Sequence, residues 1–416
     1  MRLLSFLAEG FLLYTKPTTP LNMATDEKHY ALTAIASAAR FSTRGLAVGL
    51  SFILAACSAP GIKDSTQTGS PQPAKSRETS HAVALTVAAV GDVMLGTDFP
   101  QDRLPPTELN LLEPVSYTLQ QADIAFGNLE GVLQDGGEPV KRCSNPANCY
   151  LFRTPSYFAQ QLKQAGFDAM TLANNHARDF GEEGRSNSMA ALDAAGIYHS
   201  GSEGDIASWE IKGKKVALIA FAPFAGANSM LDPEFVQEQI ALLNQTHDIV
   251  LVSFHGGAEG ADVAHVPFAT EYYHGENRGN VVEFAHLAVQ AGADLVVGHG
   301  PHVPRALELY QGRLIAYSLG NFATYWGIKV SGDNGLAPIL TAELGPDGSF
   351  LGGKIVSARQ IRPAGPVLDE KHTAARLIRE LTKADFPATA LSIDERGGIG
   401  IANPSALSGA PPQSHP

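Results

Sequence analysis

Six short polar clusters, each at the end of an apolar run, contain residues that could hold a divalent metal ion. They are rich in Asp, Glu, Asn and His, whose oxygens and nitrogens are the usual protein ligands of such ions. In chain order the clusters are Gly91-Asp92, Gly127-Asn128-Leu129-Glu130, Asn174-Asn175-His176, His255-Gly256-Gly257, Gly298 to His302 and Ser318 to Asn321. Their spacing suits alternating strands and helices, so we expect them to meet at one edge of a single sheet.

Metal-assisted hydrolysis or group transfer is the chemistry that such a centre would perform. A divalent ion polarises a phosphoryl or acyl oxygen and lowers the pKa of bound water towards about 7. A His beside the ion can protonate a leaving group or orient attacking water. One buried His is more often a hydrogen-bonded core residue than a ligand. Several strand ends that each deliver a ligand-type side chain nevertheless favour a metal site.

The elements that must position these clusters are short apolar runs without alternation, which are typical of strands buried on both faces. The runs span residues 85–90, 123–126, 169–173, 216–222, 248–254, 294–297 and 314–319. Helix-like stretches lie between several of them, at 107–122, 155–165, 184–195 and 279–291. The pattern predicts an α/β fold in which helices cover a largely parallel core.

The C-terminal third has a different pattern. Residues 337–344 and 349–361 flank a Pro/Asp/Gly turn, which predicts an antiparallel hairpin at a sheet edge. Residues 371–383 predict one more amphipathic helix, and the chain from about residue 402 is expected to fray.

Composition excludes some classes of function. The 416 residues are 44% hydrophobic, which is ordinary for a globular protein, and the net charge of −12 gives no basic footprint for nucleic acid. No G-x-x-x-x-G-K-[ST] loop follows any predicted strand, which argues against a phosphate-cradling NTPase.

The N-terminal segment resembles a bacterial lipoprotein signal. Arg40 and Arg44 precede an apolar run, 46–56, that is short for a membrane span and ends in Ala55-Ala56-Cys57. The resemblance implies cleavage before Cys57 and lipid attachment to its thiol. A plain secretory signal and a buried helix are the alternatives. Met23 offers an internal start, which would leave residues 1–22 untranslated.

We therefore divide the chain into a signal segment, a tether, a folded domain and a C-terminal helix with a tail. The boundaries are 1–57, 58–84, 85–362 and 363–416. The tether is rich in Ser, Thr, Pro, Gln and Lys and cannot bury enough apolar surface to order itself.

Cys143 and Cys149 flank a loop with one Pro and two Asn residues. In an exported protein this arrangement predicts a local disulfide. Two free thiols would fit a cytosolic protein, and a metal clip lacks further Cys or His residues close by.

The ordered motifs GDVMLG, FGNLEG, LANNH, FHGG, VVGHGPHV and YSLGNF resemble the CapA family over about residues 85–325. This family is named for bacterial capsule and poly-γ-glutamate synthesis and is related to calcineurin-like metallophosphatases. The resemblance implies a layered, metallophosphatase-like α/β sandwich with a two-sheet β core flanked by helices.

The resemblance also implies roles for individual residues. The metal ligands, for one or two divalent ions of the Mn, Zn, Fe or Mg type, would be Asp92, Glu130, Asn175, His255, His299 and His302. His176 would be the catalytic acid. The chain departs from the superfamily pattern where Met94 and Gly300 stand in places that often hold His, which bears on the number of ions.

Five further residues would support the site or contact substrate: Asn128, Asn174, Glu259, Arg305 and Asn321. Glu259 lies in a long polar insertion that could equally be a solvated loop. Arg305 could bind an anionic substrate or pair with a nearby acid. Asn321 could orient a ligand His or merely cap a turn.

Two hypotheses of function follow. The first is an exported, lipid-anchored, CapA-like protein of the cell or outer membrane, facing periplasm or cell surface, with a metallophosphatase-like hydrolase site. It would act in synthesis or attachment of a capsule or poly-γ-glutamate type polymer. Its partners would be that anionic polymer or its precursor, a membrane synthase and the membrane, but no nucleic acid. The alternative is a non-catalytic accessory protein that holds polymer or synthase in the same cleft.

Overall fold

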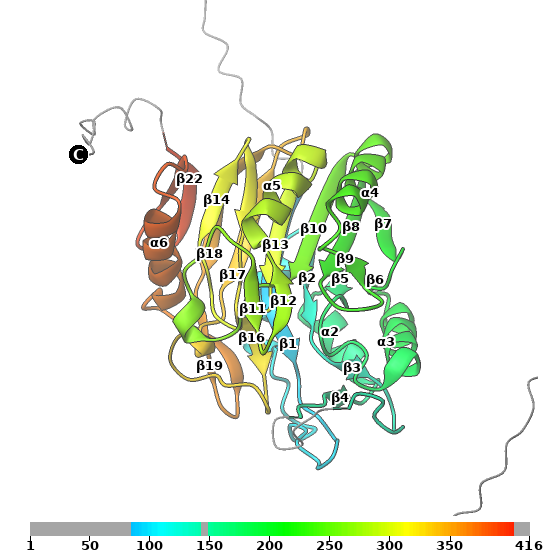
Figure 1. Cartoon of the computed structure of the whole chain (residues 1–416). Helices are drawn as coiled ribbons and strands as arrows, with labels where there is room; N and C mark the ends of the chain where they lie inside the picture. The colour runs from blue at the N-terminus through cyan, green and yellow to red at the C-terminus, as the bar shows by residue number, and fades with distance from the viewer. Residues whose placement is uncertain (1–84, 143–148, 403–416) are drawn as a thin grey trace, which may run out of the picture. The chain divides into compact units, whose positions relative to one another are not determined.

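The computed structural model describes residues 85–142 and 149–402. Two mixed sheets face each other and helices cover their outer faces (Figure 1). This arrangement confirms the predicted α/β class and the two-sheet β core flanked by helices.

The first sheet has nine strands in the order β21-β22-β18-β17-β1-β2-β5-β6, with β16 paired in parallel to the end of β1. Its strands are β1 (Leu85–Met94), β2 (Ile124–Leu129), β5 (Ala169–Thr171), β6 (Tyr198–Ser200), β16 (Asn321–Thr324), β17 (Ile339–Leu344), β18 (Phe350–Val356), β21 (Leu391–Ile393) and β22 (Gly398–Ile401). The β1-β2-β5-β6 portion is parallel, as expected.

The second sheet has seven strands in the order β14-β15-β13-β10-β8-β7, with β9 beside β8. Its strands are β7 (Ile206–Ile211), β8 (Lys214–Ala222), β9 (Asn228–Ser229), β10 (Ile249–His255), β13 (Leu295–His299), β14 (Leu307–Tyr310) and β15 (Arg313–Ala316). Short two-stranded ladders pair β3 (Val132–Leu133) with β4 (Arg153–Thr154), β11 (Glu271–Tyr273) with β12 (Glu276–Gly279) and β19 (Ala358–Ile361) with β20 (Gly365–Leu368).

Five of the α-helices in the described chain cover the two outer faces, and the sixth closes one end of the core. The helices are α1 (Glu113–Gln120), α2 (Phe158–Ala165), α3 (Gly181–Ala195), α4 (Pro233–Thr246), α5 (Val281–Ala291) and α6 (Thr373–Asp385). Buried residues of α1, α2 and α3 pack on the nine-stranded sheet, and those of α4 and α5 pack on the seven-stranded sheet. Helix α6 closes one end of the core between the sheets through Ala375 and Ile378.

The absence of alternation in the strand sequences follows from burial on both faces. In β1, Val87 and Ala89 lie in the core between the sheets, whereas Ala88 and Val90 lie under the helices. Successive strand residues point to opposite faces, so both sets must be apolar.

Three expectations from the sequence need correction. The hairpin is not at a sheet edge, because β17 lies between β1 and β18, and the run 349–361 divides into β18 and β19. Helix α4 was not predicted, although Asp232 caps it by accepting from Phe235 N and Pro233 opens it. Residues 373–401 belong to the domain itself, since β22 pairs with β18 and α6 enters the core.

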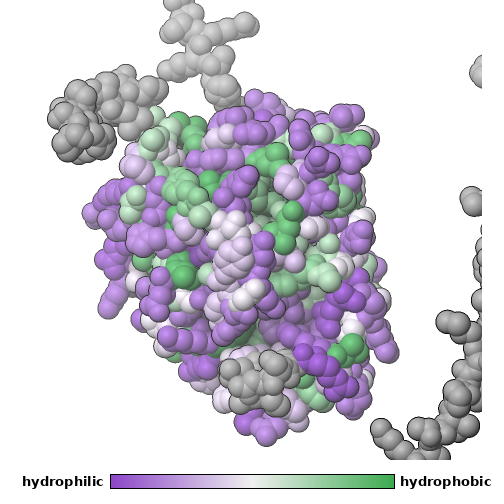
Figure 2. Space-filling view, in the orientation of Figure 1, coloured by the Kyte–Doolittle hydropathy of each residue, from purple (hydrophilic) through white to green (hydrophobic). Residues whose placement is uncertain are grey.

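On the face shown in Figure 2, the visible described residues are mostly hydrophilic, with apolar ones scattered among them. None of the described helices has the length and apolar character needed to cross a bilayer. Cys57, the signal segment, the tether and the tail from 403 lie outside the described residues.

Candidate metal centre

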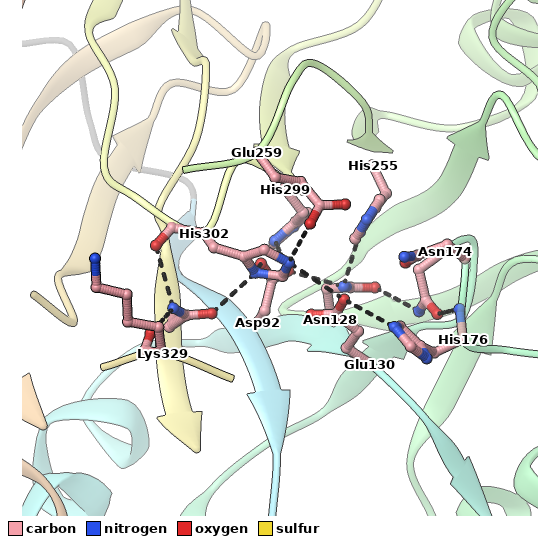
Figure 3. A network of polar contacts seen from close by, with 12 residues as sticks. Asp92, Asn128, Glu130, Asn174, His176, His255, Glu259, His299, His302 and Lys329 are labelled. Carbon is pink, nitrogen blue, oxygen red and sulfur yellow. Dashed lines mark hydrogen bonds and ion pairs between the residues drawn. The ribbon is translucent and has the colours of Figure 1, made fainter. Parts of the chain in front are cut away.

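The predicted site residues meet where strands of both sheets end, rather than at one edge of a single sheet. Asp92 and Asn128 come from β1 and β2, and Glu130 directly follows β2. His255 and His299 close β10 and β13 of the other sheet. Figure 3 shows their side chains pointing into one space. The carboxyl ends of parallel strands therefore converge as expected, but from two facing sheets.

Asp92, Glu130 and His302 form the centre of this group. Each offers one ligand atom, these atoms all lie within 4.8 Å of one another, and all three residues are buried. His302 Nδ1 lies 3.2 Å from Asp92 Oδ2, and His302 Nε2 lies 3.6 Å from Glu130 Oε1. Two carboxylates and one imidazole at this spacing are suited to a divalent cation.

Asn128 connects the strand ends of the nine-stranded sheet. Its Nδ2 donates to Asp92 Oδ1 at 2.9 Å and lies 3.3 Å from His255 Nδ1. Its Oδ1 accepts from Asn174 Nδ2 at 3.0 Å and from Thr171 Oγ1 at 3.3 Å. Asn128 and Asn174 thus hold the acidic side of the centre in place.

The structure leaves several buried ligand-type atoms at the site without a hydrogen-bond partner among the described residues. They are Glu130 Oε1 and Oε2, Asn175 Oδ1, His255 Nε2 and His299 Nε2. An unpaired buried polar atom costs about 1–3 kcal/mol, and native proteins carry few of them. These atoms belong to predicted metal ligands, so the residues present fit a divalent ion.

The charges at the centre are strongly perturbed. Burial raises the pKa of Asp92, but the imidazoles of His299 and His302 outweigh it and hold that pKa well below its usual range. Burial, together with the Asp92 carboxylate, raises the pKa of Glu130 to about 8. Burial also lowers the pKa of His255 well below its ordinary value, which keeps this ring neutral. A neutral imidazole is the form that binds a metal.

His302 is held by the polypeptide in a fixed orientation. Its φ of 59° is left-handed, and Asn321 and Asn334 both donate to its carbonyl, at 3.1 and 3.0 Å. Its Nδ1 lies 2.9 Å from Asn321 Oδ1, which favours a proton on Nδ1 and leaves Nε2 for a cation. Burial lowers the pKa of His302, but Glu130 and Asp92 outweigh it and raise that pKa to about 10.

His176 lies on the other side of Glu130. Its Nε2 is 4.0 Å from Glu130 Oε1, and its Nδ1 is 2.7 Å from Asp179 Oδ2. Lys141 Nζ lies 2.9 Å from the other oxygen of Asp179, and Phe152 packs on the His176 ring with centroids 4.3 Å apart. Burial lowers the pKa of His176. The ring is therefore oriented by Asp179 and presents Nε2 to the site.

Two glycines allow the close approach of backbones at the centre. A Cβ on Gly91 would lie 1.9 Å from Gly320 O, and Gly300 has a φ of 109° with its Cβ position 3.1 Å from His255 Cδ2. No side chain fits at either place. Gly300 is thus required by packing, and Met94 is a buried apolar residue at the end of β1.

The substrate-contact alternative for Arg305 is not what the structure shows. Arg305 is fully buried and makes two hydrogen bonds to Glu271, at 2.9 and 2.8 Å. Glu271 also accepts from Ala258 N. The pair fixes the loop that carries Glu259, whose Oε2 lies 3.7 Å from His302 Nε2.

Two adjoining cavities open onto the centre. One has a volume of about 510 Å³ and is lined by Lys141, Tyr150, Asn175, His176, Phe224, Glu259, Tyr273, His274, Glu276 and Arg278. The other measures about 380 Å³, and Glu130, His176, Glu259 and His302 are among its walls. Because His176 and Glu259 line both cavities, a ligand can reach the cation site and His176 together.

Sequence reasoning missed Asp179, Lys141 and Thr171. Asp179 is three residues after His176, a spacing that brings side chains together in a turn, so it carried a local signal. Lys141 and Thr171 contact the site from distant segments and carried none.

Cys149 is disulfide-bonded. Cys143 lies outside the described residues, so the pairing of Cys143 with Cys149 stays a prediction.

Comparison with known proteins finds curated relatives that match across most of the domain. The PGA biosynthesis protein CapA of Bacillus subtilis (strain 168) is 27% identical over 319 residues, covering 72% of this chain and 78% of that protein. The capsule biosynthesis protein CapA of Bacillus anthracis is 28% identical over 291 residues, covering 65% of this chain and 66% of that protein.

A solved structure, the 5'-nucleotidase precursor from Thermus thermophilus, aligns with a TM-score of 0.36 and 13% identity, covering 72% of this chain and 58% of that one. The family model described as bacterial capsule synthesis protein PGA_cap matches residues 86–325, more than half of the chain and every ligand candidate at the centre. The chain belongs to this bacterial capsule synthesis family.

Proposed function

We propose that this protein is a metal-dependent hydrolase or transferase that acts on an anionic envelope polymer or its precursor. The bond attacked would be a phosphoester or an amide. Family membership and the names of the two Bacillus relatives support a role in capsule or poly-γ-glutamate type synthesis.

The observation that carries the proposal is the set of unpartnered buried atoms around His302. Asp92, Glu130 and His302 would hold a divalent ion, and His255 and His299 would complete its ligands from the facing sheet. When bound, such an ion polarises a phosphoryl or acyl oxygen and acidifies water. Asn175, whose Oδ1 has no hydrogen-bond partner within the described part of the chain, is a further ligand candidate.

His176 would accept and donate the proton that is transferred in the reaction. Asp179 accepts from Nδ1, so the lone pair of Nε2 faces the cavity. Because burial lowers the pKa of His176, the ring is neutral near pH 7 and can accept a proton there. The proton that it takes up is readily given to a leaving group. Burial raises the pKa of Asp179, but His176 and then Lys141 outweigh it and lower that pKa, so Asp179 stays ionised beside the ring.

The place of action would be the cell envelope. The signal segment ending at Cys57 supports export and lipid anchoring, which would keep the domain on a tether near a membrane synthase. The cavities would face the polymer or its precursor in this arrangement.

Elemental analysis of the full chain, followed by a panel of phosphoesters and γ-glutamyl amides, tests the proposal. We expect one or two equivalents of a divalent metal, turnover of one substrate class, loss of turnover on chelation and recovery on reloading. If the protein contains no metal and turns over none of the panel, the proposed enzyme activity is contradicted and the non-catalytic accessory role is supported.

A further inference from the structure

A third cavity adjoins the metal centre and is not part of the site described above. It has a volume of about 380 Å³, and its walls include Thr97, Phe99, Pro100, Gln101, Arg103, Leu151, Trp326 and Arg362. It shares Tyr150, Phe152 and Gly327 with the cavity that contains Glu130 and His302. The two spaces are thus neighbours along one surface, and each has the volume of a small-molecule site.

Two arginines flank one indole in this third cavity. The guanidinium carbons of Arg103 and Arg362 lie 4.7 and 5.9 Å from the ring centroid of Trp326. Trp326 is 45% exposed, which is unusual for so large an apolar residue unless its face has a use. Cation–π contacts hold both guanidinium groups near the ring.

The charges of the two arginines are not balanced locally. Within the described chain neither Arg103 nor Arg362 forms an ion pair, whereas Arg153, Arg278 and Arg305 all do. Among the residues that the structure describes, no Asp or Glu lines this cavity. Arg103 Nη2 donates to Gln101 Oε1, and Arg362 Nη2 donates to Ile328 O, so most N–H groups of the two guanidinium forks have no protein acceptor among the described residues. The two arginines therefore form a local cationic site in a chain whose net charge is −12.

Lys329 adds a third positive charge, in the neighbouring cavity. It lines the cavity that contains His302, it forms no ion pair among the described residues, and its carbonyl accepts from Asn321 (Figure 3). Positively charged side chains therefore line both of the neighbouring cavities.

We propose that the Arg103–Trp326–Arg362 cavity is a subsite for carboxylates of an acidic peptide-like chain whose neighbouring segment lies at the metal centre. Guanidinium groups pair with carboxylates in a planar, often bidentate geometry, and the indole face covers the methylenes between them. Hydrolysis of this acidic ligand rests on the proposed function, but binding of the ligand to the subsite needs no metal.

Fluorescence of Trp326 offers a direct measurement, because the chain has only two tryptophans. Trp209 lies in β7, stacked on Tyr198, and does not line the cavity. In the full chain carrying Trp209→Phe, with chelator present, a short oligo-γ-glutamate should change the Trp326 emission saturably. Oligoglutamine, which lacks the charge, should not.

The charge variants then locate the binding. Arg103→Gln and Arg362→Gln should each weaken binding roughly tenfold, since a charge-assisted hydrogen bond is worth about one factor of ten. The matched control Arg376→Gln, at an exposed residue of α6, should bind as the parent does. Metal content and hydrolysis of a small ester, measured in parallel, report the proposed function independently of subsite binding.

Three results would overturn the subsite. One is the absence of saturable binding by oligo-γ-glutamate, and another is equal binding by both arginine variants and the parent while circular dichroism shows them folded. Polyphosphate binding in place of oligo-γ-glutamate would instead assign the cavity to a phosphate-rich polymer. Absence of hydrolysis while oligo-γ-glutamate still binds would contradict only the proposed hydrolase activity.

Discussion

Two histidines flank the same oxygen of Glu130 and lie in opposite environments. His176 Nε2 is 4.0 Å from Glu130 Oε1 and His302 Nε2 is 3.6 Å from it. Burial lowers the pKa of His176, whereas the Glu130 and Asp92 carboxylates outweigh burial at His302 and raise its pKa to about 10. Similar side chains at similar distances are thus prepared for different tasks.

The difference arises from the partners of each ring. Asp179, which orients His176, is itself paired with Lys141, so part of its charge is already balanced. Of the carboxylates near His302, Glu259 is paired with Arg278, but Asp92 and Glu130 have no Lys or Arg within ion-pair distance in the described chain, and they attract positive charge. A proton on His302 partly takes the place that a metal ion would fill. In the proposed function, the His302 side would therefore be the cation site and the His176 side the proton-transfer site.

Breaking the proton-transfer side should give the largest effect. His176→Asn should lower kcat about 10²- to 10⁴-fold, the usual contribution of general acid–base catalysis, with metal content unchanged. Steady-state kinetics and elemental analysis of the same sample measure both. His265→Asn, at a side chain 70% exposed, is the matched control and should retain activity. Loss of metal in His176→Asn would place this ring among the ligands instead.

Removing a ligand from the cation side should instead lower the affinity for metal. Glu130→Gln removes a buried carboxylate from the centre, so metal affinity should fall by more than about 100-fold, beyond the loss usual for a supporting residue. Isothermal titration with Mn²⁺ or Zn²⁺ measures it, with exposed Glu203→Gln as the control. Unchanged affinity in Glu130→Gln would remove this residue from the cation site.

A smaller effect should follow from loosening His302 without removing a ligand. Asn321→Ala deletes the contacts to His302 Nδ1 and to its carbonyl, so metal affinity should fall about 10- to 100-fold. His176 should keep its pKa in this variant, which NMR titration of the ring can follow. An affinity equal to that of the parent would show that Asn321 only caps its turn.

Lowering the pH should weaken metal binding on the cation side. The pKa of Glu130 is raised to about 8 and that of His302 to about 10, so near pH 7 an incoming ion displaces protons from both. Metal affinity should therefore rise with pH, by roughly tenfold per pH unit for each proton displaced. Titrations at several pH values, in buffers of different ionisation enthalpy, count these protons. A flat profile would contradict the raised values.

Part of the site could be predicted from local sequence pattern. Asp92, Glu130, His255 and His299 were placed together because each sits at or beside the end of an apolar strand, a local pattern. That the strands belong to two facing sheets could not be read from apolar runs alone, since strands of either sheet are buried on both faces.

Contacts between distant segments could not be predicted from a local sequence pattern. The bidentate pairing of Arg305 with Glu271 depends on the fold of the 258–271 loop, and Lys141 reaches Asp179 across 38 positions of sequence (179 minus 141). Helix α4 was missed for another reason: an Asp followed by a Pro, here Asp232 and Pro233, begins turns as well as helices.

Anomalous diffraction from crystals of the full chain grown with Mn²⁺ is the most direct test of the central claim. We predict a peak in contact with Asp92, Glu130 and His302, and no peak at His176 Nε2. A peak elsewhere, or none at full Mn²⁺ loading of the solution, would contradict the division between a cation side and a proton-transfer side.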